Sequence, residues 1–160
     1  MTRLSLSGAL ALALFATGCS TTTVTMVDDM PDPAPTPGDM AMVSECVDGA
    51  ASAEGSTFEC SNVDLVAYVP LEAFDADQLN DIWGWTDPLT GTEYALVGTT
   101  NGTAFVDLST PQFPRLVGKL PTSNELTPVW RDIKVIRDHA YIGSEAPDHG
   151  LQIFDLKKLL

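Results

Sequence analysis

The stretch Asn80–Leu108 constrains the fold more than any other part of the chain, because it has the pattern of a β-hairpin. Tyr94–Thr99 and Thr103–Leu108 are runs rich in β-forming residues, and Asn101-Gly102 lies between them. An Asn-Gly pair readily adopts the positive φ angles of a tight turn, so it is a strong hairpin signal. A weaker version of the pattern follows at Arg131–Leu156. We therefore predict an all-β fold built on a repeat.

The two copies of the repeat can be aligned, and their spacing changes only at segments expected to be turns. A period in the forties, with short strands separated by turns, is the size of a β-propeller blade. We predict that residues 45–160 form the blades of a β-propeller-like domain, with a β-sandwich as the alternative. The aligned segments are Asn80-Asp81-Ile82 with Arg131-Asp132-Ile133, Ala95–Gly98 with Ala140–Gly143, Gly102 with Gly150, and Asp107-Leu108 with Asp155-Leu156.

Two segments before the first copy also have recognisable patterns. Asn62–Leu71 alternates apolar and polar residues and is predicted to be a strand that ends at Pro70. Glu72–Gln78 is expected to form one helical turn or a polar loop. Asp75 and Asp77 in this segment, together with Asp81, suggest a calcium loop, but the glycine and the distal glutamate of an EF-hand loop are absent, so no motif supports calcium and no cofactor is predicted.

The first residues have the features of an export signal. An apolar run at Leu10–Phe15 is too short to span a bilayer, and small residues precede Cys19. This arrangement is similar to a bacterial lipobox, in which the cysteine is lipidated and becomes the new N-terminus. We predict a lipoprotein signal peptide over residues 1–18 and lipidation of Cys19, with an ordinary signal peptide as the alternative. Ser20 after the cysteine favours the outer membrane.

Residues 19–44 are predicted to be a disordered tether. The segment is rich in threonine, aspartate and alternating prolines, which favour an extended chain and cannot form a core. A spacer between the lipid and the domain explains this composition without any binding role.

The charge of the chain is strongly acidic, with a formal net charge of -14. No lysine or arginine occurs from Cys19 to Pro114. Nucleic acid is therefore not an expected partner, because the chain offers few cations to neutralise phosphates. An acidic surface also suits a soluble exported domain.

Cys46 and Cys60 remain once Cys19 is assigned to lipid. Because an exported protein enters an oxidising compartment, we expect these two cysteines to form a disulfide. The short segment between them contains two glycines and small side chains that allow a loop to close. A redox pair or a zinc site is not supported, since the spacing is wrong and no histidine lies nearby.

The residues of the repeat resemble those of the choice-of-anchor B family, whose members are exported proteins with LVIVD-type repeats. The resemblance extends over residues 46–160 and implies a β-propeller-like repeat domain at the cell surface or secreted. It carries no established catalytic residues. The segments that support it are NDIWGWTDPLTGTEYALVGTTNGTAFVDLSTPQFPRLVGKLPT at Asn80–Thr122, WRDIKVIRDHAYIGSEAPDHGLQIFDL at Trp130–Leu156, Cys46–Gly49 and Phe58–Cys60.

The chain would supply about two and a half blades, whereas a closed propeller needs at least about four. Members of the family are also considerably longer. We therefore expect the sequence to be part of a longer protein, with assembly of several copies as the alternative.

Candidate ligand-binding residues fall into two groups. Trp83, Trp85 and Trp130 suggest stacking on sugar rings, although packing between sheets is the simpler role for tryptophans in such a repeat. Polar residues that occur in one copy only are better candidates than repeated ones, because an active site is normally needed once. The polar candidates are His139, Glu145 and His149, which occur only in the second copy, and Asp132, which is repeated as Asp81 but is expected near them.

Two functions are consistent with these features. The first is a non-catalytic module, anchored in the cell envelope at the outer membrane or cell surface, that binds protein or glycan. The second is an extracellular hydrolase or metal-dependent enzyme whose site is completed by missing blades. Ser144, Glu145 and His149 lie close in sequence, but no G-x-S-x-G or H-E-x-x-H motif is present. No metal ligands or catalytic residues are assigned.

Replacing Cys19 with alanine tests the lipid anchor. Without the thiol no acyl chain can be attached, so we expect Cys19→Ala to move the protein from the membrane fraction to the soluble fraction. Membrane fractionation with immunoblotting measures this, and circular dichroism should show an unchanged fold. Retention of the variant in the membrane would rule out the lipoprotein assignment.

Overall fold

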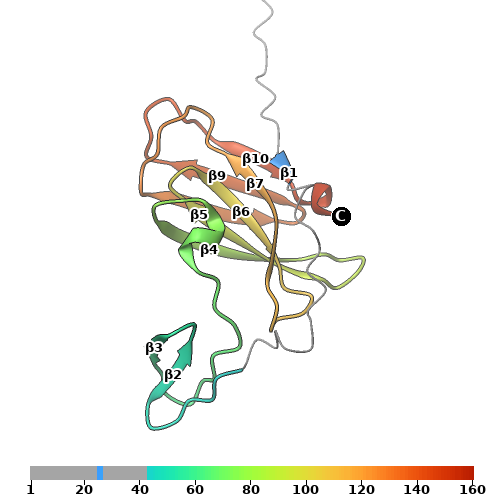
Figure 1. Ribbon diagram of the computed structural model, residues 1–160. Coiled ribbons are helices and arrows are strands. Elements are labelled where there is room, and N and C mark those ends of the chain that lie inside the picture. Colours follow the sequence, from blue (N-terminus) through green and yellow to red (C-terminus); the bar gives the residue numbers. More distant parts are fainter. Residues whose placement is uncertain (1–24, 27–42) are drawn as a thin grey trace, which may run out of the picture.

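The computed structural model describes residues 25–26 and 43–160, and within them the protein is all-β (Figure 1). The predicted signal peptide, Cys19 and most of the predicted tether lie outside the described residues. No helix in the described part is long and apolar enough to cross a membrane. The elements are β1 (Thr25–Met26), β2 (Ala50–Ala53), β3 (Ser56–Glu59), η1 (Leu71–Phe74), β4 (Leu79–Thr86), β5 (Glu93–Thr99), β6 (Gly102–Asp107), β7 (Arg115–Pro121), β8 (Arg131–Ile136), β9 (His139–Ser144), β10 (Gln152–Asp155) and η2 (Leu156–Leu159), where η marks a 3₁₀ helix.

Three antiparallel sheets contain these strands. The central sheet has the order β1-β7-β6-β5-β4, so β4 to β7 form an up-and-down meander. The C-terminal sheet has the order β10-β9-β8, and β2 and β3 form a separate N-terminal hairpin. The prediction of an all-β fold is therefore confirmed. The described residues form no closed barrel or ring of sheets, so the propeller-like arrangement stays a prediction.

The hairpin predicted from the sequence is present as β5 and β6, but its turn lies one residue earlier than expected. Thr99 pairs with Gly102, so the turn residues are Thr100 and Asn101, and neither has a positive φ. The Thr99 hydroxyl donates to the Gly102 carbonyl at 3.0 Å and closes the turn.

Gly102 is needed for a close approach between backbones rather than for the turn. A Cβ at this position would lie 2.3 Å from the carbonyl oxygen of Leu120 on β7 and 3.1 Å from the Cα of Pro121. Only glycine allows β6 and β7 to come this close at Gly102.

The two copies of the sequence repeat have the same strand pairing. The first copy runs through β4, β5 and β6, and the second through β8, β9 and β10. Residues that match in the alignment pair with residues that also match, so the register is preserved in all three strands. The paired positions are Ile82 with Val97 and Val97 with Ala104 in the first copy, and Ile133 with Ile142 and Ile142 with Gln152 in the second.

The main core lies between the central and C-terminal sheets, which pack face to face. Phe105 of β6 stacks on Phe154 of β10, with ring centroids 4.7 Å apart. The alternation of strand side chains places the buried residues of each sheet on the face toward the other. This core consists of Trp85, Tyr94, Leu96, Phe105, Leu120, Ile133, Ala140, Ile142, Phe154 and Leu156.

The opposite face of the central sheet is covered by the segment around η1. Phe74 is buried there against Val97, Ala104 and Val106. The segment Glu72–Gln78 therefore contains one helical turn, which was one of the two expectations. The carbonyls of Phe74 and Asp75 also accept hydrogen bonds from the Lys119 ammonium, at 2.7 and 3.1 Å.

The strand predicted at Asn62–Leu71 is absent. Leu65 makes one isolated bridge with Ser44, and no other residue of the segment lies in a strand or bridge. The segment links the N-terminal hairpin to the central sheet, and Val63 is largely exposed. Alternating residues without a neighbouring strand have no ladder of hydrogen bonds, so the prediction was wrong because it considered the pattern alone.

Cys46 and Cys60 form a disulfide with a Cα–Cα distance of 5.9 Å, which is the pairing expected from the sequence. The bond closes the N-terminal hairpin, which Figure 1 shows below the two larger sheets. Tyr68 packs against Phe58 of this hairpin, with ring centroids 5.3 Å apart. A small hairpin has little core of its own, so the disulfide supplies much of its stability.

The segment predicted as a tether contains β1, a strand of two residues. Thr25 pairs with Lys119 and Met26 with Gly118, at the outer edge of β7. An unpaired strand edge offers free backbone donors and acceptors, and an extended chain can satisfy them. The tether prediction did not consider this pairing.

Replacing Gly102 with alanine tests the close approach of β6 and β7. The added Cβ meets backbone atoms that cannot rotate away, so we expect a loss of about 1–3 kcal/mol in the free energy of unfolding. Gly84→Ala is the matched control, since a Cβ there meets nothing within 4 Å. Urea denaturation of both variants measures the difference, and equal stabilities would contradict this role of Gly102.

Candidate functional site

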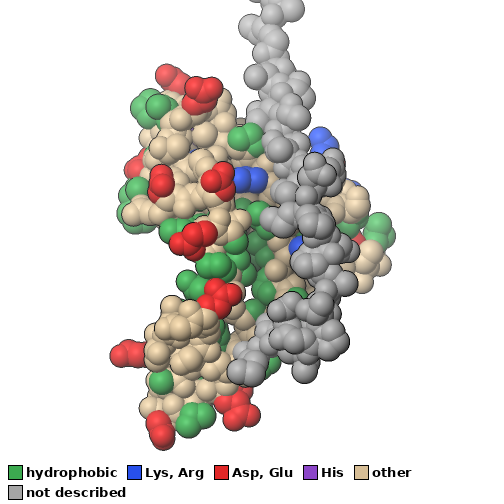
Figure 2. Space-filling view, in the orientation of Figure 1, with side chains coloured by type: hydrophobic (Ala, Val, Ile, Leu, Met, Phe, Trp, Pro, Cys, Tyr) green, Lys and Arg blue, Asp and Glu red, His purple; other side chains and the backbone are tan. Residues whose placement is uncertain are grey.

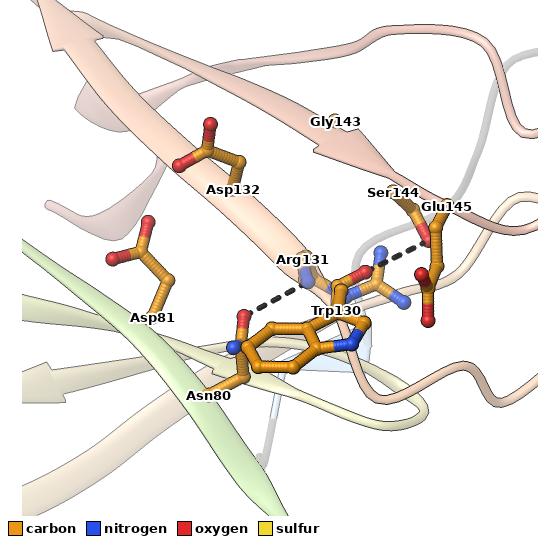
Figure 3. A pocket seen from close by; sticks show the side chains of 8 residues that line it. All are labelled: Asn80, Asp81, Trp130, Arg131, Asp132, Gly143, Ser144 and Glu145. Carbon is orange, nitrogen blue, oxygen red and sulfur yellow. Dashed lines mark hydrogen bonds between the residues drawn. The ribbon is translucent and has the colours of Figure 1, made fainter.

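A groove of about 480 Å³ lies where β4 of the central sheet meets β8 of the C-terminal sheet. Figure 3 shows Asp81 and Asp132 at one end, and Asn80, Trp130 and Glu145 at the other. The volume is within the range of small-molecule sites. Its lining residues are Asn80, Asp81, Trp130, Arg131, Asp132, Gly143, Ser144 and Glu145.

Two side chains of β4 fix the position of β8 at the groove. The Asn80 Oδ1 accepts a hydrogen bond from the Arg131 backbone N–H at 2.8 Å (Figure 3). The Asp81 Oδ2 accepts one from the Ile133 backbone N–H at 2.7 Å. These strands belong to different sheets and share no backbone ladder, so side-chain oxygens satisfy the donors instead.

Asp132 occupies the position equivalent to Asp81 but makes different contacts. Its Oδ1 accepts from the Lys134 ammonium at 2.8 Å, and the same ammonium lies 3.7 Å from Asp81 Oδ2. This hydrogen bond holds the pKa of the Asp132 carboxyl below its usual value and raises the pKa of Lys134. The ammonium also lies 4.7 Å from the ring centroid of Trp83, a cation–π distance.

Arg131 is a buried cation beside the groove, with only 2% of its surface exposed. Its Nε donates to the Thr99 carbonyl at 3.1 Å, and Nη1 lies 3.1 Å from His149 Nε2. Burial lowers the pKa of the guanidinium. Its Nη2 is buried and has no hydrogen-bond partner among the described residues.

The contacts of His149 fix its tautomer. Nδ1 lies 3.0 Å from the Gly150 carbonyl, which can only accept, so Nδ1 carries the proton. Nε2 then has the lone pair that accepts from Arg131. Both ring nitrogens are occupied, and the imidazole orients the guanidinium rather than facing solvent.

Trp130 presents its side chain at the groove and is 62% exposed. Its backbone is fixed, because its carbonyl accepts from the Glu145 N–H at 3.4 Å and from the Ser144 hydroxyl at 3.5 Å. The Asn80 amide nitrogen and the Glu145 carboxylate have no hydrogen-bond partner within residues 25–26 and 43–160. An exposed indole and polar groups without partners therefore meet at this end of the groove.

The structure brings together three of the seven candidates chosen from the sequence. Trp130, Asp132 and Glu145 line the groove, while His149 lies behind it against Arg131. His139 begins β9, at the end of the strand opposite Ser144. It therefore does not contribute to the groove.

The other two tryptophan candidates, Trp83 and Trp85, have structural contacts. Trp85 is 6% exposed and packs against Tyr94 in the core between the sheets, with ring centroids 5.4 Å apart. Trp83 is partly exposed and lies under the Lys134 ammonium.

A Ser-His-acid arrangement is not formed at this loop. The Ser144 hydroxyl donates to the Trp130 carbonyl and accepts from the Ala146 N–H at 3.2 Å, while both nitrogens of His149 have other partners. The described residues also contain no group of three or more His, Cys, Asp or Glu side chains placed to hold a metal. Asp75, Asp77 and Asp81 thus do not form the calcium loop considered from the sequence.

Sequence reasoning missed Asn80 and Arg131. Both lie at the start of their repeat copy and occupy equivalent positions, yet one is an amide and the other a cation. This difference within an otherwise repeated motif was the available signal, because it indicates that the position has different neighbours in the two copies.

Comparison of the chain with protein-family models, curated proteins and solved structures found no match.

The two equivalent aspartates allow a matched test of how the groove is held. Asp81→Ala removes the acceptor of the buried Ile133 N–H, so we expect the free energy of unfolding to fall by about 1–3 kcal/mol. Asp132→Ala removes only an exposed ion pair, so a much smaller change is expected. Thermal denaturation of both variants measures this, and equal losses would show that Asp81 does not connect the sheets.

Proposed function

We propose that the protein is a non-catalytic binding module of the cell envelope that takes a protein or glycan ligand in the groove between β4 and β8. The observation that carries the proposal is the exposed indole of Trp130 beside polar groups without partners. Such a combination of an apolar surface and a few polar groups is typical of ligand sites.

The repeat supports a propeller-like arrangement of the two larger sheets. Because the two copies share the same register, aligned residues lie on the same face of their respective sheets. The exposure of aligned residues can therefore be compared between the central and the C-terminal sheet. Leu96 and Phe105 are buried on the face of the central sheet toward the C-terminal sheet, whereas the equivalent Tyr141 is partly exposed and Ile153 largely exposed. In a propeller-like array, this face packs against the next sheet of the same repeat.

The opposite face of the central sheet, at Ile82, is exposed where the matching face of the C-terminal sheet is buried. Ile82 is 63% exposed, while the equivalent Ile133 is fully buried against the central sheet. Equivalent isoleucines thus differ in exposure according to whether a neighbouring sheet is present, which is the pattern expected of successive blades.

The position of the groove also suits a binding role. It lies where the chain enters β4 and β8 and where it leaves β9 through Ser144. In a propeller these are connections on a single face, next to the innermost strands, where loops present ligand-binding side chains.

The remaining parts of the proposal come from the sequence. The similarity to a lipobox at Cys19 supports attachment to the outer membrane or cell surface through lipid. The resemblance of residues 46–160 to the choice-of-anchor B family supports export. Acidic side chains, scattered over the view in Figure 2, disfavour a nucleic-acid partner. The hydrolase or metal-enzyme alternative has no support from the contacts of Ser144 and His149.

Replacing Trp130 with alanine tests whether the groove binds ligand. We expect Trp130→Ala to reduce binding to any ligand found on arrays of glycans and extracellular proteins, because the exposed apolar surface is lost. Leu89→Ala is the control, since Leu89 is highly exposed in the β4–β5 turn and does not line the groove.

Two results would contradict the proposal. Binding that is unchanged in Trp130→Ala would place the ligand elsewhere on the protein. A ligand that is cleaved on incubation with the protein, seen by mass spectrometry, would favour the enzyme alternative.

A further inference from the structure

The aromatic end of the groove offers both hydrogen-bond donors and acceptors. The amide nitrogen of Asn80 donates, and the carboxylate of Glu145 accepts. Nη2 of Arg131 also has no partner among the described residues, but it is buried out of reach of solvent. The groups at this end that can meet a ligand are therefore those of Asn80 and Glu145.

The charges around the groove nearly balance. Three carboxylates lie there, on Asp81, Asp132 and Glu145, together with the cations Arg131 and Lys134. Lys134 lies between the two aspartates and offsets one of their two negative charges. With Arg131 buried close to the Glu145 end, the groove keeps more carboxylates than cations, so an anionic ligand is disfavoured. The Asn80 amide nitrogen needs an acceptor, which a hydroxyl group supplies and an ammonium does not, so a neutral ligand with hydroxyl groups suits the groove best.

The indole of Trp130 supplies the apolar part of the site. A pyranose ring has a rim of hydroxyl groups and a face of C–H bonds, which carry a small positive charge. An indole face is apolar and negative, so the two surfaces complement each other. The Trp130 carbonyl accepts hydrogen bonds from the Ser144 hydroxyl and the Glu145 N–H, so the backbone that carries the indole is held before any ligand binds.

The side chains of this end are specific to one copy of the repeat. The position equivalent to Trp130 is Leu79, and the position equivalent to Glu145 is Thr100. The repeated fold needs neither an indole nor a carboxylate here, since the first copy forms the same strands without them. Their presence is therefore explained by a role outside the framework of the sheets.

We propose that this groove binds a neutral saccharide unit. Its ring stacks on Trp130, and its hydroxyl groups accept from the Asn80 amide nitrogen and donate to Glu145. This assignment rests on the proposed binding function and specifies its ligand class. A basic protein segment is the competing ligand, and the experiment below separates the two.

The test uses the whole chain on an array of neutral, amino-containing and acidic oligosaccharides, with pentalysine as the basic peptide probe. We expect binding to neutral oligosaccharides. Trp130→Phe keeps an aromatic face and should retain binding. Trp130→Leu, which introduces the residue of the first copy, should weaken it roughly tenfold, the ratio that about 1.4 kcal/mol corresponds to. Circular dichroism should show the same fold for both variants.

The outcomes distinguish this inference from the function on which it rests. Binding of pentalysine but of no neutral saccharide, lost in Trp130→Leu, would overturn the saccharide assignment and leave the binding function intact. Saccharide binding equal in the two variants would overturn stacking on Trp130 and the groove as the site. Binding of no probe on the array would overturn the saccharide assignment.

Discussion

The packing of the C-terminal sheet on the central sheet is the interaction on which the rest of the structure depends. Each sheet alone has one apolar face that would be open to water, and a small sheet is not stable in that state. When the sheets pack, Phe105 stacks on Phe154 and Ile133 becomes fully buried, so these faces are removed from solvent. The groove exists only because β4 and β8 are then side by side.

Polar side chains determine how the two sheets are aligned. Apolar packing has no direction, whereas a hydrogen bond requires particular atoms to meet. Asn80 and Asp81 accept hydrogen bonds from backbone N–H groups of β8 and so fix the position of β8 along β4. Arg131 connects the same strand back to the hairpin through the Thr99 carbonyl. Most of the residues that line the groove therefore align the sheets, and the proposed ligand contacts fall to Trp130, Glu145 and the amide nitrogen of Asn80.

The sequence allowed the prediction of features that depend on nearby residues. The hairpin of β5 and β6 and the strand positions of the repeat follow from alternation and turn residues. The strand expected at Asn62–Leu71 failed because a strand needs a partner, and no local pattern shows whether one is present. The groove could be predicted only in part, because contacts such as Asp81 with Ile133 join segments about fifty residues apart. Asp81 and Asp132 look identical in the alignment and differ only in what lies beside them.

The strand β1 has a consequence for the behaviour of the chain under load. Among the described residues, it joins the central sheet at the outer edge of β7 through Thr25 and Met26. A force applied to the N-terminal part would act first on the β1–β7 pairing and break its hydrogen bonds. The two larger sheets are joined by many buried side chains, among them Leu120 of β7, whereas β1 is joined by one short pairing. The β1–β7 pairing is therefore expected to separate before the interface between the two larger sheets does.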